Sequence, residues 1–126
     1  MNQAPSTIVF LRVEGLALGL LCVWLYGGLG QPWWIFAVLL LVPDVAILGY
    51  LRGPKVGAIA YNIAHSWALA ATGYVVVWYL WPDNAFLLSL PLILGAHIGL
   101  DRALGYGLKL PTGFKDTHLG RIGKAA

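Results

Sequence analysis

The sequence predicts an all-α integral membrane protein, an up-down bundle of four transmembrane helices. Three observations support this fold class: hydrophobic residues make up 60% of the 126 residues, charged residues make up only 10%, and the apolar residues gather in four runs. Ordinary soluble domains are only about 45–50% apolar. Because the four runs occupy nearly the whole chain, residues 1–126 are expected to form a single domain.

Each apolar run is long enough to cross a bilayer, which takes about 20 mainly apolar residues. The predicted spans cover residues 8–29, 33–51, 56–81 and 85–108. The short connections between them contain turn-forming Gly, Pro, Asp and Asn, so consecutive helices are expected to be antiparallel neighbours. The first run holds Arg12 and Glu14 and lacks a clear cleavage site, which favours a retained helix over a signal peptide.

The positions of the basic residues predict that both termini face the cytoplasm. Positive residues flank the second connection or follow the fourth span: Arg52, Lys55, Lys109, Lys115, Arg121 and Lys124. The first and third connections contain no Lys or Arg and are bordered by Trp and Tyr, which favour a membrane interface. The net charge of +3 therefore follows from membrane topology, and no nucleic-acid partner is expected.

Ionisable and amide side chains interrupt all four apolar runs. They are Glu14 in the first, Asp44 in the second, Asn62 and His65 in the third, and His97 and Asp101 in the fourth. At 1.5 Å per helical residue, all lie roughly 10–18 Å from the cytoplasmic ends of their helices. Ionisable groups inside a membrane are costly and turn toward a bundle interior. These residues are therefore expected to meet in one layer.

The spacing of these residues is typical of a metal site. His97 and Asp101 are four residues apart, and Asn62 and His65 are three apart, so each pair shares a helix face. Imidazoles and carboxylates from several helices bind metals in bundles, and they suit zinc, manganese or iron. The single Cys22 excludes a structural site built from several thiolates. We expect a divalent metal, with zinc favoured.

The same residues can also be explained without a metal. A membrane His can be only a hydrogen-bonded core residue. Glu14 can pair with Arg12 or Arg102, and Asp44 can bond local donors at a kink made by Pro43. Arg102 is expected to reach the lipid headgroups rather than pair with Asp101.

Two resemblances follow from these motifs. The run HIGLDRALGYGLKLPTGFKDTHLG, with VPDVAILGYL and YNIAHSW, resembles an uncharacterised domain-of-unknown-function family of small four-helix bacterial membrane proteins, over nearly the whole chain. This implies a multi-pass protein of the bacterial inner (plasma) membrane, without an activity. More distantly, the order PD, HS and HIxxD is similar to the membrane-bound metal-dependent hydrolases and implies ligands at Asp44, His65, His97 and Asp101. The acid and His that follow PD in those hydrolases are missing, and Asn62 stands where a second His is expected.

The expected function is a metal-dependent hydrolase that acts on a lipid or another amphiphile at the cytoplasmic leaflet, although whether the protein is an enzyme stays open. A bound metal lowers the pKa of its water to about 7. Glu14 or Asp101 would take the proton, and Asn62 would donate to an oxyanion. His118 would act as a lid or an extra ligand. Alternatively, residues 109–126 form a basic cytoplasmic tail that lies on anionic lipid.

Other classes of function remain open. Haem ligation by His65 and His97 would make an electron carrier. The acids would instead serve a small proton- or cation-coupled transporter, although no inverted repeat or broken-helix pair is visible in the sequence. Small residues also form stripes at Gly95, Gly99, Ala103 and Gly107 and at Ala60, Ala64, Ala68 and Thr72. These stripes would pack inside the bundle or form a homodimer.

Overall fold

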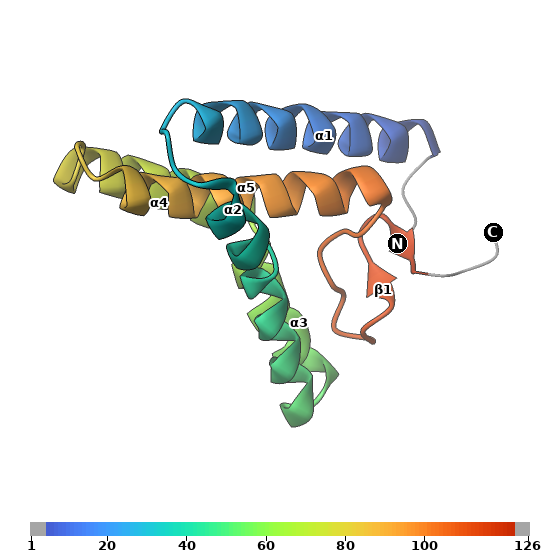
Figure 1. Cartoon of the computed structure of the whole chain (residues 1–126). Helices are drawn as coiled ribbons and strands as arrows, with labels where there is room; N and C mark the ends of the chain where they lie inside the picture. The colour runs from blue at the N-terminus through green and yellow to red at the C-terminus, as the bar shows by residue number, and fades with distance from the viewer. Residues whose placement is uncertain (1–4, 123–126) are drawn as a thin grey trace.

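The computed structural model describes residues 5–122, which are almost entirely helical up to residue 104 (Figure 1). The elements are α1 (Pro5–Gly27), α2 (Trp33–Leu39), the 3-10 helix η1 (Val42–Arg52), α3 (Pro54–Ala64), α4 (Trp67–Leu80), α5 (Ala85–Leu104), β1 (Asp116–Thr117) and β2 (Gly120–Arg121). The all-α prediction is confirmed, apart from one short antiparallel β-hairpin near the C-terminus.

Helices α1 and α5 lie side by side because glycines on both helices allow a close approach (Figure 1). A Cβ atom at Gly99 would overlap the backbone of α1 at Gly19, and one at Gly95 would lie 2.5 Å from the Cys22 sulfur. The Gly95 and Gly99 part of the small-residue stripe on α5 is therefore used within the chain. Small residues are the usual means of close helix packing in membranes.

A second helix pair is formed by η1 and α3, which are joined at Gly53. Gly53 has a φ of 110°, in a region that side chains disfavour. Across the pair, Gly57 lies directly against the Tyr50 ring, and a Cβ at Gly49 would lie 2.9 Å from that of Ala60. In Figure 1 this pair points away from α1 and α5 instead of lying alongside them.

The helices therefore do not pack as the regular up-down bundle predicted from the sequence, and two of the predicted spans are irregular: the second changes from α to 3-10 helix, and the third is bent. In the second span the α-helical hydrogen bonds are interrupted between α2 and η1, where Pro43 has no N–H and Asp44 N donates to Leu41 O at 3.2 Å, a 3-10 bond. The third breaks after Ala64, and Ser66 caps the new helix by accepting from Leu69 N at 3.1 Å. The bend between α3 and α4 is 42°.

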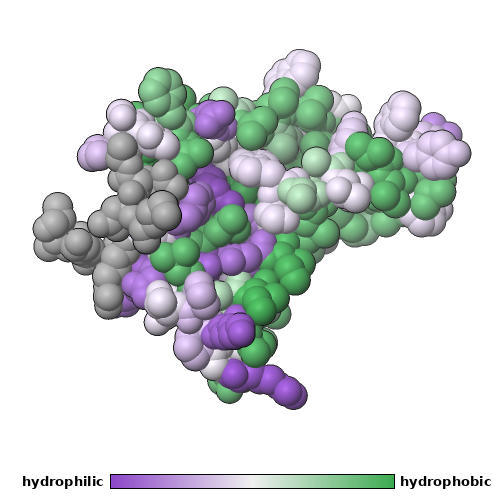
Figure 2. All heavy atoms as spheres, turned by 180° about the vertical axis from the view of Figure 1, so that it is seen from behind, coloured by the Kyte–Doolittle hydropathy of each residue, from purple (hydrophilic) through white to green (hydrophobic). Residues whose placement is uncertain are grey.

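The apolar runs remain long enough to cross a membrane. Three helical segments within residues 5–122 qualify by length and composition: α1, Trp33–Arg52 and α5. A fourth qualifies if the bent pair of α3 and α4 is one span. Figure 2 shows apolar side chains over most of one face, while hydrophilic side chains gather near the C-terminal segment and at the tip of the η1–α3 pair.

The last part of the described chain folds back instead of forming a plain basic tail. Helix α5 ends at Leu104, earlier than predicted, because Gly105 takes a left-handed conformation with a φ of 93°. Residues 105–122 then form a compact segment, here called the cap, around the β1–β2 hairpin. Thr117 and Leu119 are buried within it. Lys124 lies outside the described residues.

We predict that Gly99→Ala destabilises the protein by about 1–3 kcal/mol, because overpacking at a close backbone contact forces the helices apart. Gly73→Ala is the matched control, since its Cβ would meet Pro91 at an ordinary 3.6 Å. The free energy of unfolding in detergent measures both. Equal stability of the two variants would contradict the packing described here.

Candidate metal site

Four predicted metal ligands, Asp44, His65, His97 and Asp101, converge on one point. Their ligand atoms all lie within 4.8 Å of one another. His65 Nε2 is 3.0 Å from His97 Nε2, 3.3 Å from Asp44 Oδ1 and 3.6 Å from Asp101 Oδ2. His97 Nε2 is 3.2 Å from each of the same two oxygens. The structure thus brings together residues from η1, the end of α3 and α5.

These separations are those of ligands around one tetrahedral ion. Bonds of about 2.0–2.1 Å to zinc place neighbouring tetrahedral ligands about 3.3–3.4 Å apart. Five of the six separations among the four atoms range from 3.0 to 3.6 Å, and the sixth, between the two carboxylate oxygens, is no more than 4.8 Å. Five of the six separations therefore suit ligands that share one ion.

Backbone carbonyls fix the orientation of both imidazoles. His65 Nδ1 lies 2.9 Å from Tyr61 O, and His97 Nδ1 lies 2.5 Å from Leu40 O. A carbonyl only accepts, so both Nδ1 atoms carry hydrogen and donate. This leaves the two Nε2 lone pairs facing each other beside two carboxylates. Four acceptors at such distances repel one another unless a cation, or a proton on one of the Nε2 atoms, lies between them.

The two helix interruptions leave backbone carbonyls that accept hydrogen bonds from side chains of α5. In a continuous α-helix, Leu40 O would accept from Asp44 N, but that amide bonds Leu41 O instead. Leu40 O is thereby free for His97. At the second break, the carbonyl of His65 accepts from Arg102 Nη2 at 3.2 Å. Side chains of α5 thus satisfy the backbone at both breaks.

Tyr61 and Lys109 surround the cluster and were not identified from the sequence. The Tyr61 ring stacks on His65 with centroids 3.7 Å apart, and its hydroxyl lies 3.5 Å from Asp101 Oδ2. Lys109 Nζ lies 4.7 Å from the Tyr61 centroid and 3.9 Å from that of Phe114. The four-residue spacing of Tyr61 and His65 could have indicated the stacking; nothing local indicated Lys109.

The cluster opens toward the surface at Asp44. The Asp44 side chain is 45% exposed, compared with 16% for Asp101, 6% for His97 and 0% for His65. A molecule that reaches the cluster therefore meets Asp44 before the histidines.

Four other polar residues considered in the sequence lie outside the cluster. Glu14 is exposed on α1, outside the cluster, and has no ion pair within residues 5–122. Asn62 fastens the cap: its Nδ2 donates to Lys109 O at 2.8 Å, and its Oδ1 accepts from Lys109 N at 2.6 Å. His118 lies inside the cap, where its Nδ1 accepts from Leu108 N at 2.8 Å, and it is not one of the four residues of the cluster. Arg102 is only 5% exposed and does not reach outward.

The spacing also argues against haem. Two nitrogens 3.0 Å apart leave no space for a porphyrin between them. The carboxylate oxygens beside them would further crowd its plane.

We predict that cap docking weakens in acid. Burial and the Arg102 guanidinium lower the pKa of His118, and protonation of Nδ1 would oppose the Leu108 N–H that it accepts. Because the docked cap favours the neutral ring, docking is complete above the ordinary His pKa of about 6.5. It is lost as the pH falls below that value toward the lowered pKa.

Hydrogen exchange of the cap amides, corrected for intrinsic rates, measures this change. His118→Gln is the control, because its side-chain oxygen can still accept a hydrogen bond but does not titrate. The same pH profile in both proteins would contradict the assignment.

Comparisons with known proteins identify the family. Residues 8–122 match the family described as domain of unknown function DUF4260. No curated protein and no solved structure matches the chain, and the resemblance to membrane-bound hydrolases receives no support from these comparisons. The match covers nearly all of the chain, and the protein therefore belongs to the DUF4260 family.

Proposed function

We propose that this chain is an integral membrane metalloprotein that holds one divalent cation on Asp44, His65, His97 and Asp101. One observation carries the proposal: two imidazole nitrogens and two carboxylate oxygens converge at tetrahedral spacing, with both imidazoles oriented by backbone carbonyls. Hydrogen bonding of the second ring nitrogen is the usual arrangement of metal-bound histidines. Zinc is favoured by the tetrahedral spacing, with manganese and iron as the other candidates.

The activity that we propose is hydrolysis of a lipid or another amphiphile at the cytoplasmic leaflet of the bacterial inner membrane. A bound cation of this kind activates water and polarises a carbonyl or phosphoryl oxygen. Catalytic zinc keeps a position for water, which four protein ligands fill unless one leaves or the coordination expands. Asp44 is the ligand expected to move, since its side chain is the most exposed of the four.

The carboxylates provide the proton acceptor. Glu14 and Asn62, the other candidates from the sequence, lie elsewhere or are occupied by the cap. Asp44, once off the metal, can take the proton from water. Asp101 is held beside the Tyr61 hydroxyl and is expected to remain a ligand.

A small cation transporter is the second candidate, favoured by the two helix breaks. Discontinuous helices with freed carbonyls often hold ions in transporters. Here the breaks at Leu40 and His65 lie directly at the cluster. In this case the cation would be the cargo, and the site would have to open to both sides of the membrane.

We predict about one zinc ion per chain in protein extracted gently from membranes, because the four ligands form a complete set. His97→Ala and Asp44→Asn should lose most of this zinc. Elemental analysis of the purified proteins is the measurement. His118→Ala should keep its zinc, since His118 is not in the cluster.

His97 is buried, so His97→Ala can lose zinc simply by failing to fold. Asp44→Asn avoids this problem, because the Asp44 side chain is half-exposed. If the wild-type protein neither co-purifies with a metal nor binds one on addition, the metalloprotein proposal is wrong. Equal zinc in wild type and Asp44→Asn would remove Asp44 from the ligand set.

Two assays of the zinc-loaded protein in liposomes distinguish the functions. A hydrolase is expected to release product from a fluorogenic acyl ester or phosphodiester amphiphile, without zinc uptake. A transporter is expected to move zinc into the vesicles, without hydrolysis. The variant Asp44→Asn should abolish whichever activity is present, because both depend on the cluster.

A further inference from the structure

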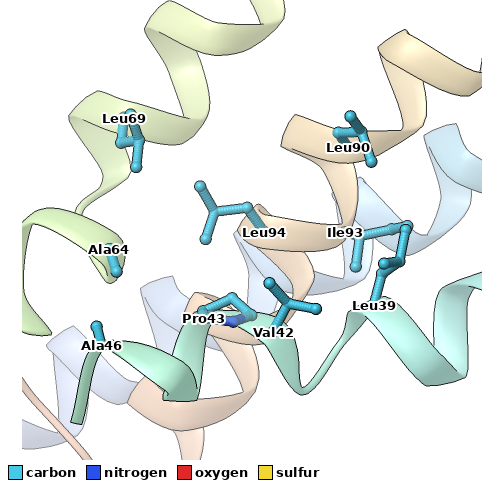
Figure 3. Close-up of a pocket in the computed structure, with 9 residues that line it drawn as sticks. All are labelled: Leu39, Val42, Pro43, Ala46, Ala64, Leu69, Leu90, Ile93 and Leu94. Atoms are coloured by element: carbon cyan, nitrogen blue, oxygen red, sulfur yellow. The ribbon is translucent and has the colours of Figure 1, made fainter. Parts of the chain in front are cut away.

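An apolar cavity of about 330 Å³ lies beside the cluster. Figure 3 labels the nine side chains around it, all of them aliphatic or proline. Its walls come from α2, η1, the end of α3, α4 and α5, so the cavity forms where the two helix breaks meet α5. This volume lies at the lower end of the range of small-molecule sites, which is about 300–1,000 Å³.

The cavity adjoins the cluster through the backbone of three elements. Pro43 directly precedes Asp44, and Ala64 directly precedes His65. Leu94 lies one helical turn before His97 on α5, and its side chain points into the cavity in Figure 3. The lining of the cavity is therefore continuous along the chain with three of the four residues of the cluster.

The cavity is open at its side to the surroundings of the helices. Val42 is 52% exposed, Leu69 is 44% exposed and Leu90 is 38% exposed. A water molecule inside would find no side-chain partner, although stable buried water needs two to four polar partners, as a rough rule. The chemistry of the lining instead fits a hydrocarbon chain, which enters sideways from the bilayer.

We propose that this cavity binds the hydrocarbon chain of an amphiphile whose headgroup lies at the metal cluster. This inference rests on the proposed function and specifies its substrate class: a molecule with an aliphatic chain next to a metal-binding carboxylate, ester or phosphate. The headgroup lies at the polar cluster while the chain stays in apolar surroundings, so neither part is transferred into an unfavourable medium.

A second apolar cavity provides a matched comparison. It measures about 370 Å³ and lies between α1, α4 and α5, where Leu18, Ala71 and Pro91 contribute to its lining. None of its lining residues directly neighbours a cluster ligand in the sequence. Ordinary bilayer lipid is expected to occupy it without selection.

The test uses zinc-loaded full-length protein in phosphatidylcholine nanodiscs and a fatty acid that carries a diazirine in its chain. Illumination should label the cavity beside the cluster, as mapped by mass spectrometry, and excess unlabelled fatty acid should compete. Ala46→Trp fills the cavity and should reduce this labelling about tenfold, equivalent to ~1.4 kcal/mol. Ala71→Trp in the second cavity should leave it unchanged.

Zinc is measured on the same samples, so the two proposals fail separately. Zinc-loaded protein whose labelling is not competed, or is equal in both cavities, overturns the chain-binding site alone. Absence of zinc binding overturns the metal centre. If Ala46→Trp keeps its zinc but also keeps full labelling, the chain does not lie in this cavity.

Discussion

The repulsion among four hydrogen-bond acceptors inside the protein is the constraint on which the rest of the structure depends. Two lone-pair nitrogens and two carboxylates face one another at 3.0 to 3.6 Å. Because both Nδ1–H groups already donate to carbonyls, the repulsion is relieved only by a cation between the four atoms or by a proton on one of the Nε2 atoms. A cation at the centre would change a strongly unfavourable arrangement into a stabilising one that links η1, α3 and α5.

The helix interruptions near the cluster leave backbone carbonyls that need hydrogen-bond donors. A carbonyl without a partner is costly in an apolar environment. The breaks nevertheless persist, because His97 donates to Leu40 O and Arg102 donates to His65 O. The same α5 helix therefore stabilises the irregular backbone and contributes two residues of the cluster, His97 and Asp101. The cap also contacts this region: Asn62 makes hydrogen bonds to the backbone of Lys109, whose side chain lies over the Tyr61 ring.

Much of this protein could be predicted from sequence, because hydrophobicity and helical spacing are local properties. The lengths and positions of the apolar runs agree with the observed helices to within a few residues at most ends. The four residues of the cluster were identified because ionisable residues in apolar runs must find partners, and His97 and Asp101 share a helix face. Glu14 met the same local criterion, yet it lies exposed on the outside of α1.

The sequence by itself determined an apolar helical protein with a set of polar side chains at similar depth. Only the tertiary structure decided which of them meet, because the direction of each helix after a break depends on the contacts made by distant residues. Pro43 indicated a kink, but not that Leu40 O would receive His97. The burial of Arg102 and Lys109 likewise depends on carbonyls and aromatic rings supplied from up to 48 residues away, which no local pattern encodes.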